Sequence, residues 1–296
     1  MNSNHSFVGS NVALITPMFD DGSVDYEALS QLIDFHIDSG SSSIVSVGTT
    51  GESATVGVKE HLKIIDYTVK YAAKRIPIIA GTGANSTSEA IELTQEAKNL
   101  GADACLLVTP YYNKPTQEGL FQHYKLIAES VNIDQILYNV PGRTAVDMSV
   151  DIISRLSEIS NIIGVKDATG DLSIIKKLVQ KCPKDFLLLT GDDATAVDFL
   201  IEGGHGGISV TANIVPKELQ KVYLAAIAGN LELAKTLNSQ LANFHKNLFL
   251  EANPIPVKWA LHKMGRCEKG IRLPLLELSN EFKIIIENDL KELDLL

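Results

Sequence analysis

The chain has 296 residues, of which 45% are hydrophobic and 21% charged, which is typical of a globular protein whose core needs no disulfide or metal. Its formal net charge of −10 argues against nucleic acid or an anionic membrane as a partner, and no apolar run reaches membrane-spanning length. The first residues lack the pattern of a secretory signal, and Cys105, Cys182 and Cys267 share no CxxC spacing, so we expect reduced thiols and a cytoplasmic protein.

Short apolar runs that end in Gly, Thr, Pro or Asn recur along the first two-thirds of the chain and predict eight strands. They cover residues 12–18, 42–48, 77–83, 104–112, 135–141, 161–169, 185–191 and 205–211. Segments with helical periodicity lie between them, at 25–39, 59–74, 86–99, 117–130, 149–157, 172–180, 193–201 and 216–228. Ser86 or Ser88 can cap the third of these helices, and Gly101 closes it.

This alternation predicts the fold class. Strands that alternate with helices require a parallel sheet, and strands that are apolar on both faces indicate a sheet covered on both sides. Eight such units close as a (β/α)8 TIM barrel, which we favour over an open doubly wound sheet. After Gly229 the strand pattern stops, and residues 230–251, 255–264 and 274–292 have helical periodicity. We therefore expect an α/β barrel catalytic domain at 1–229 and a C-terminal helical domain at 230–296.

Chemically useful side chains lie at the ends of the predicted strands, where this fold places its active sites. These ends supply hydroxyls, glycines, tyrosines, one lysine and one arginine, at residues 16–17, 48–52, 81–85, 109–112, 138–144, 166–167 and 206–209. The predicted strand ends carry no array of carboxylates or histidines of the kind that would bind a metal. Matches to GxxxxGK[ST], HExxH and GxSxG are also absent.

One lysine, Lys166, lies within the apolar run at 161–169. Burial penalises a charged amine and lowers its pKa, and a neutral amine can attack a carbonyl to form a Schiff base. In a strand Lys166 shares a face with Gly164 and Ala168, which are small enough to leave room for a substrate. The alternative is a structural lysine that extends past the strand end or pairs with Asp167.

Other side chains at the same rim are candidates for binding and proton transfer. Tyr138 could shuttle protons or simply cap the core, and Thr49 and Thr50 could relay protons or merely form a turn. Arg143 could clamp a carboxylate or lie on the surface. The glycines at 203–207 could present N–H groups to an anion or form a tight turn. Because all these side chains are expected at one rim, a catalytic site is favoured over the separate structural roles.

Six segments distributed along the chain carry recognisable motifs: SVGTTGESAT, TPYYNKPTQEG, LYNVPGRT, IIGVKDATG, GHGGISVTAN and NPIPVKWA. From Ser10 to about Leu275 the chain resembles the 4-hydroxy-tetrahydrodipicolinate (dihydrodipicolinate) synthase family. The wider superfamily, which includes sialate lyases and keto-deoxy-sugar aldolases, shares the barrel, the lysine and the YNxP tyrosine. Within this superfamily, the GRT after YNVP and the threonine doublet before GE resemble the corresponding motifs of the synthases. One mild departure is Asp167, where many relatives have Glu.

This resemblance implies condensation of pyruvate with L-aspartate 4-semialdehyde through a lysine Schiff base. The product is 4-hydroxy-tetrahydrodipicolinate, in the first committed step of diaminopimelate and lysine biosynthesis, and no cofactor or metal is required. Lys166 would form the imine and Tyr138 would be the general acid and base. Thr49 and Tyr112 would complete the proton relay, with Tyr112 reaching in from a neighbouring subunit of a tetramer built as a dimer of dimers. The residues implied to bind substrate are Thr50, Arg143, Ile208 and Gly191.

The resemblance also implies allosteric inhibition by L-lysine at a subunit interface away from the imine. The residues implied are Ser53, Ala54, His61, Asn85, Glu89 and Tyr111. Glu89 would meet the ammonium of the ligand, while Asn85 and Tyr111 would bond its carboxylate. Alternatively, Glu89 is only a first-turn acid favoured by its helix dipole. Val58 stands where some sensitive enzymes have a second histidine.

Three alternative functions remain open at this point. The first is a pyruvate-dependent aldolase for a keto-deoxy sugar acid, which Arg143 argues against. The second is a non-catalytic, ligand-binding relative on the same barrel, which would be expected to lose Lys166, Tyr138 or the threonines. The third is a barrel isomerase that binds phosphate after its seventh and eighth strands, where the glycines at 203–207 lie.

Overall fold

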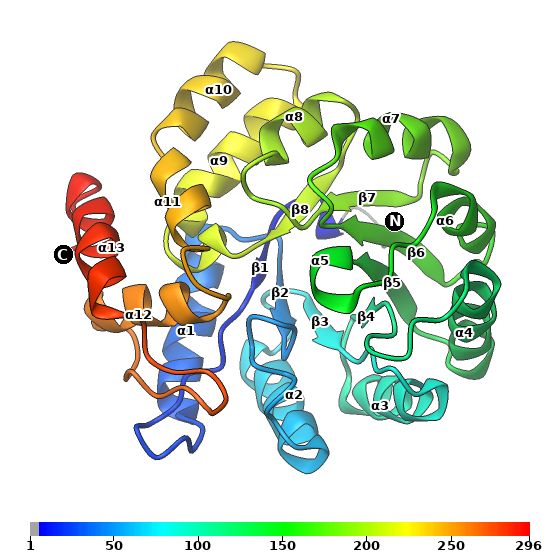
Figure 1. The fold of residues 1–296 in the computed structure, drawn as a ribbon, viewed down its shortest axis with the longest axis horizontal. Helices are drawn as coiled ribbons and strands as arrows, with labels where there is room; N and C mark the ends of the chain where they lie inside the picture. Colours follow the sequence, from blue (N-terminus) through cyan, green and yellow to red (C-terminus); the bar gives the residue numbers. More distant parts are fainter. Residues whose placement is uncertain (1–5) are drawn as a thin grey trace.

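The structure is a computed structural model that describes residues 6–296. Its centre is a closed barrel of eight parallel strands, in which each strand pairs with the next and β8 pairs with β1 (Figure 1). The strands are β1 (Gly9–Ala13), β2 (Ser43–Ser46), β3 (Ile78–Gly81), β4 (Ala104–Val108), β5 (Asp134–Asn139), β6 (Ile162–Asp167), β7 (Leu187–Thr190) and β8 (Gly206–Ser209). The predicted TIM barrel is therefore confirmed.

Helices cover the outside of the barrel. They are α1 (Tyr26–Ser39), α2 (Val58–Ala72), α3 (Thr87–Leu100), α4 (Gln117–Ser130), α6 (Val150–Leu156), α7 (Leu172–Lys181), α8 (Ala196–Ile201) and α9 (Pro216–Ile227). Capping explains several of their bounds: the Asp25 carboxylate accepts two backbone N–H groups of α1, and the Ser86 hydroxyl accepts one of α3. Gly101 ends α3 with a φ of 91°. None of the helices in residues 6–296 is long and apolar enough to cross a membrane.

Apolar side chains form an inner layer within the barrel and outer layers between strands and helices. Ile79, Leu106 and Leu189 belong to the inner layer. Along β6 the alternation is broken, because the pairing with β5 shifts register just before Ile136. Ile163 belongs to the inner layer and Val165 to an outer layer, whereas residues two apart in a regular strand share one face. This β-bulge is a local irregularity of the kind found near active sites.

Two predicted strands were wrong in extent. The strand predicted at 12–18 is β1, which begins earlier and ends at Ala13, and the strand predicted at 104–112 ends at Val108. Leu14, Ile15 and Met18 are buried after β1 without belonging to a strand. Burial of a connecting segment thus produces the same apolar pattern as a strand. A short helix, α5 (Pro141–Thr144), follows β5 and was not predicted.

The C-terminal region forms α10 (Leu231–Ser239), α11 (Ala242–Asn247), α12 (Ile255–Lys263) and α13 (Asn280–Glu292). The single helix predicted at 230–251 is wrong, because the chain breaks at Gln240 and Leu241. Both residues keep right-handed helical angles, and neither is a Gly or a Pro that would mark the break in the sequence. The helix predicted from 274 begins only at Asn280. In Figure 1, α13 lies against the outer side of α12 at the edge of the molecule. The division into two domains at 229 stays a prediction.

Candidate functional site

A cavity of about 130 Å³ opens at the C-terminal ends of the strands. Six of the residues predicted to form the site line it: Thr49, Thr50, Tyr138, Arg143, Lys166 and Gly191. They lie within or just after the C-terminal ends of four strands, β2, β5, β6 and β7. The structure thus brings together residues that the sequence placed on one rim, as expected for the mouth of such a barrel.

Lys166 lies near the end of β6, directly opposite Tyr138 in the ladder with β5. Its side chain is buried, and Nζ lies 4.2 Å from the centre of the Tyr138 ring. Burial lowers the pKa of Lys166 to about 7; the charge of Asp193 opposes this shift and that of Arg143 adds to it. An amine with this pKa is neutral in a large fraction of molecules at neutral pH, and a neutral amine can attack a carbonyl.

The alternative role for Lys166, an ion pair with Asp167, is not observed. The Asp167 carboxylate instead accepts hydrogen bonds from Thr169 and from the Asn139 amide, the latter at 3.1 Å. Within residues 6–296 Lys166 forms no ion pair, whereas Lys258, another buried lysine, is paired with Glu52. Lys166 is therefore the buried lysine whose amine is available to a ligand.

Gly191, at the end of β7, provides space for the lysine side chain. A Cβ at this position would lie 2.6 Å from Cε of Lys166 and 2.8 Å from Cβ of Ala168. Any larger residue would displace the lysine or close the cavity. The substrate-binding role implied for Gly191 stays a prediction, but its packing requirement follows from this geometry.

Tyr138 also lines this cavity. Burial raises the pKa of Tyr138, while the Arg143 charge and a hydrogen bond with Thr49 act in the opposite direction. The phenol is therefore protonated at neutral pH and can donate a proton to a developing oxyanion. Its hydrogen bond with Thr49 joins two of the three residues that were predicted to form a proton relay.

Thr50 and Arg143 are both held by Asn253, which precedes α12. The Asn253 side-chain amide donates to Oγ1 of Thr50 at 2.9 Å, and its backbone carbonyl accepts from Nη2 of Arg143 at 3.1 Å. Asn253 and Phe249 also line the cavity. Neither residue was predicted to belong to the site, although Asn253 begins the NPIPVKWA motif. The C-terminal region therefore supplies one wall of the site.

Asp193, after β7, is a second residue that the sequence did not single out. Its buried carboxylate accepts the backbone N–H groups of Val210 and Thr211 at 3.0 and 2.9 Å. Its negative charge raises the pKa of Lys166 and so partly offsets the effect of burial.

Two predicted site residues lie elsewhere. Ile208 on β8 belongs to the inner apolar layer and is absent from the residues that line the cavity. Tyr112 is 91% exposed and is not among the residues that line the cavity of its own chain. This placement leaves the Tyr112 side chain available to a second subunit. The roles predicted for both residues stay predictions.

A neighbouring cavity of about 270 Å³ brings together most of the residues implied to bind lysine. Its lining includes Ser53, Ala54, His61, Glu89 and Tyr111, and it shares Thr49, Val140 and Arg143 with the first cavity. Asn85 lies at its edge, because its amide donates to the backbone carbonyl of Tyr111 at 3.2 Å. Nε2 of His61 lies 2.7 Å from the carbonyl oxygen of Gly81, and burial lowers the pKa of His61.

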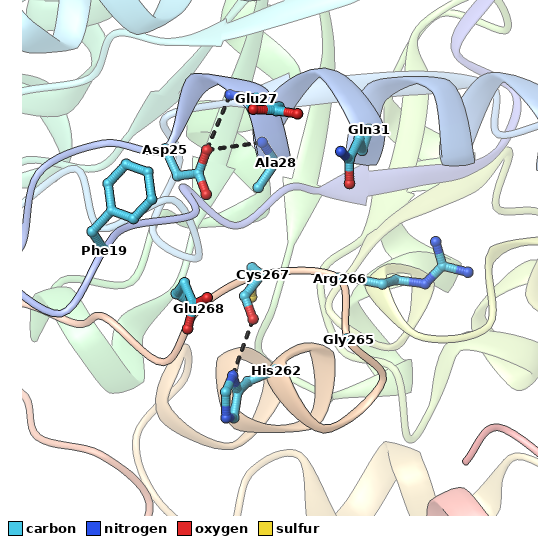
Figure 2. A pocket seen from close by; sticks show the side chains of 10 residues that line it. All are labelled: Phe19, Asp25, Glu27, Ala28, Gln31, His262, Gly265, Arg266, Cys267 and Glu268. Atoms are coloured by element: carbon cyan, nitrogen blue, oxygen red, sulfur yellow. Dashed lines mark hydrogen bonds between the residues drawn. The ribbon is translucent and has the colours of Figure 1, made fainter.

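A pocket of about 310 Å³ lies apart from both cavities, between the start of α1 and the end of α12 (Figure 2). Asp25 caps α1 there, Nδ1 of His262 donates to the carbonyl of Cys267 at 3.1 Å, and Arg266 points away from the other labelled side chains. The pocket contains no lysine or tyrosine. Across residues 6–296 no group of three His, Cys, Asp or Glu side chains could hold a metal ion.

Comparisons with known proteins found relatives both in sequence and in structure. The sequence profile of the dihydrodipicolinate synthetase family matches residues 6–293. A 4-hydroxy-tetrahydrodipicolinate synthase from Ruthia magnifica subsp. Calyptogena magnifica is 62% identical over 296 residues, which cover 100% of both chains. The structure of the chloride-inhibited dihydrodipicolinate synthase from Acinetobacter baumannii complexed with pyruvate is 56% identical with a TM-score of 0.96, covering 98% of this chain and 100% of that one. The synthase from Cyanidioschyzon merolae with lysine bound is 35% identical with a TM-score of 0.96, covering 99% and 100%.

Proposed function

This chain belongs to the dihydrodipicolinate synthetase family and catalyses the condensation of pyruvate with L-aspartate 4-semialdehyde, and we propose that Lys166 is the amine that carries the reaction. The observation that supports this role is a buried lysine without an ion-pair partner in residues 6–296, whose pKa is lowered to about 7 at the mouth of the barrel. The reaction is a lyase step in diaminopimelate and lysine biosynthesis.

The neutral Nζ of Lys166 attacks the carbonyl carbon of pyruvate, and the Tyr138 hydroxyl protonates the oxygen that leaves as water. The resulting protonated imine withdraws electrons from the methyl group, which loses a proton and becomes an enamine carbon nucleophile. Tyr138 and Thr49 carry that proton. The carbon adds to the aldehyde, whose oxygen takes up a proton. The amine of the second substrate then attacks the imine carbon, closes the ring and releases Lys166.

Both substrates are anions, so the cavity must attract negative charge in a chain with a net charge of −10. In this proposal Thr50 and the backbone of Ile208 hold the carboxylate of pyruvate, and Arg143 holds that of the semialdehyde. The Arg143 guanidinium lines the cavity and lies close enough to Lys166 to influence its pKa. A guanidinium can bind a carboxylate through two parallel hydrogen bonds.

The decisive experiment is reduction of the imine. Incubation with pyruvate and borohydride should add one reduced pyruvate to the chain, and mass spectrometry should map it to Lys166. Lys258 is the internal control, because it is buried but paired with Glu52 and should stay unmodified. Lys166→Arg should give no adduct, since a guanidinium stays protonated. An adduct at another lysine, or none in the wild type, would refute the role of Lys166.

We also propose that L-lysine binds the second cavity and slows the reaction. The cavity offers the Glu89 carboxylate for an ammonium group, and the synthase from Cyanidioschyzon merolae has lysine bound. Thr49 and Arg143 line both cavities, so a ligand could shift them directly. Initial rates should fall with added lysine in the wild type and much less in Glu89→Ala. Full wild-type activity at millimolar lysine would rule out this regulation.

The proposed enzyme is a homotetramer in which Tyr112 of one subunit completes the relay of another. The exposed Tyr112 ring supports this arrangement. Sedimentation should show a tetramer, and Tyr112→Phe should lower the turnover without changing assembly. Restored activity in a mixture of Tyr112→Phe and Lys166→Arg subunits would show that the two residues act across an interface. A fully active Tyr112→Phe enzyme would exclude the hydroxyl from the relay.

A further inference from the structure

A buried ion pair joins the loop after β2 to α12. Nζ of Lys258 lies 2.5 Å from Oε1 of Glu52, and the two side chains are 2% and 1% exposed. Taking two charges out of water is unfavourable, and a buried pair often contributes little net stability compared with apolar residues. A contribution to stability alone therefore does not explain why this ion pair is buried. Its position suggests another purpose, because Glu52 follows Thr49 and Thr50 in the same loop.

Glu52 is fixed tightly relative to Thr49. Its backbone N–H donates to the carbonyl of Thr49 at 3.1 Å and closes the turn that contains Thr50 and Gly51. The φ of Glu52 is 60°, a left-handed conformation that residues other than glycine adopt only when their surroundings hold them. A displacement of the Glu52 side chain is thus passed to the threonine doublet through a turn of four residues.

The surroundings that hold Glu52 come from the far end of the chain. Besides Lys258, the backbone N–H of Arg272 donates to Oε2 of Glu52 at 3.1 Å. The Arg272 guanidinium is itself fixed by Glu60 and by the carbonyl of Gly22. Both oxygens of the Glu52 carboxylate are therefore occupied by a rigid frame.

We propose that the Glu52–Lys258 ion pair positions Thr49 and Thr50 for pyruvate, so that Glu52 and Lys258 are positioning residues for the reaction. This inference rests on the proposed roles of the two threonines. Its physical basis is a direct connection from α12 through the carboxylate and the closed turn to the hydroxyls at the cavity. Arg143 lies outside the turn that Glu52 closes, and its guanidinium is bound by the backbone carbonyl of Asn253. The pair should therefore affect pyruvate more than the semialdehyde.

The test separates stability from position with a double variant. Lys258→Met alone leaves a buried, unpaired carboxylate and should destabilise the protein. Adding Glu52→Gln removes that charge and retains an oxygen that can accept the N–H of Arg272, so the double variant should regain most of the lost melting temperature. We expect its kcat/KM for pyruvate to stay at least tenfold below wild type. Its KM for the semialdehyde should change less than twofold.

Matched controls distinguish the outcomes. Asp289→Ala removes the acceptor of another contact of the C-terminal region, the 2.7 Å hydrogen bond from Asn247, and should lower stability with wild-type kcat/KM. Glu52→Asp keeps the charge but shortens the side chain, so it should fold and reproduce the loss for pyruvate. Wild-type kcat/KM in the recovered double variant or in Glu52→Asp would overturn the proposal. If instead the proposed function were wrong, the wild type itself would lack the borohydride adduct at Lys166, which distinguishes the two failures.

Discussion

Replacing Lys166 with Met should stabilise the folded protein at neutral pH. The pKa of Lys166 is about 7 in the folded state against an ordinary value of 10.5, chiefly because burial disfavours the ammonium. Each pKa unit of such a difference is worth about 1.4 kcal/mol, so burying this lysine lowers the unfolding free energy at pH 7 by on the order of 4 kcal/mol. Methionine has a similar length, and it has no charge to desolvate.

The effect has a definite pH dependence. Between pH 7 and 10.5 the unfolded chain holds a proton on Lys166 that the folded chain releases. The stability of the wild type therefore rises with pH across this window, and the penalty is fully present below pH 7. The variant lacks this contribution, so the difference in unfolding free energy between the two proteins should be largest near pH 6 and should shrink toward pH 10.

The assay is urea denaturation of both proteins at one concentration, at pH 6, 7, 8, 9 and 10. Taking the difference at each pH removes the titration of all groups that the proteins share. Fixed protein concentration removes the effect of subunit association. A difference that stays constant from pH 6 to 10 would refute the reasoning, because Lys166 would then have an ordinary pKa in the folded state.

Further predictions concern the cavity itself. Arg143→Ala should keep the pyruvate adduct and lower kcat/KM for the semialdehyde by about 2–5 kcal/mol in transition-state free energy; equal loss of the adduct would show that Arg143 shapes the whole cavity. Gly191→Ala should slow adduct formation at least tenfold with an unchanged circular dichroism spectrum, because its Cβ would meet Cε of Lys166 at 2.6 Å; an unchanged trapping rate would contradict this. In the wild type the trapping rate should rise through pH 7 as Lys166 loses its proton, and a rate that is flat from pH 6 to 8 would contradict the shifted pKa.

The barrel and much of its rim were predictable from sequence because both depend on local patterns. Alternating strands and helices define the parallel barrel, and the C-terminal end of each strand can be read directly from the chain. Lys166, Tyr138 and Arg143 could therefore be assigned to one rim without knowledge of any distance. The burial that lowers the pKa of Lys166 could only be expected, since it depends on the packing around β6.

The features that escaped prediction depend on contacts between distant segments. Asn253 meets Thr50 across 203 positions, and Lys258 meets Glu52 across 206, so no local pattern indicates either contact. The break after α10 escaped for another reason. Gln240 and Leu241 keep helical backbone angles, and neither is a residue that ends helices.

The wall that Asn253 contributes has a consequence for biosynthesis. Thr50 leaves the ribosome 203 residues before Asn253, which at ordinary rates of translation is roughly 10–40 s. During most of that interval β8 has not been made, and the edge of β1 that it will cover can pair with other chains. A nascent chain of this protein is therefore prone to aggregation until β8 emerges, and it lacks one wall of its site until Asn253 follows. Chaperones that bind unpaired strand edges should be most needed before barrel closure, and slow codons ahead of β8 should prolong that need.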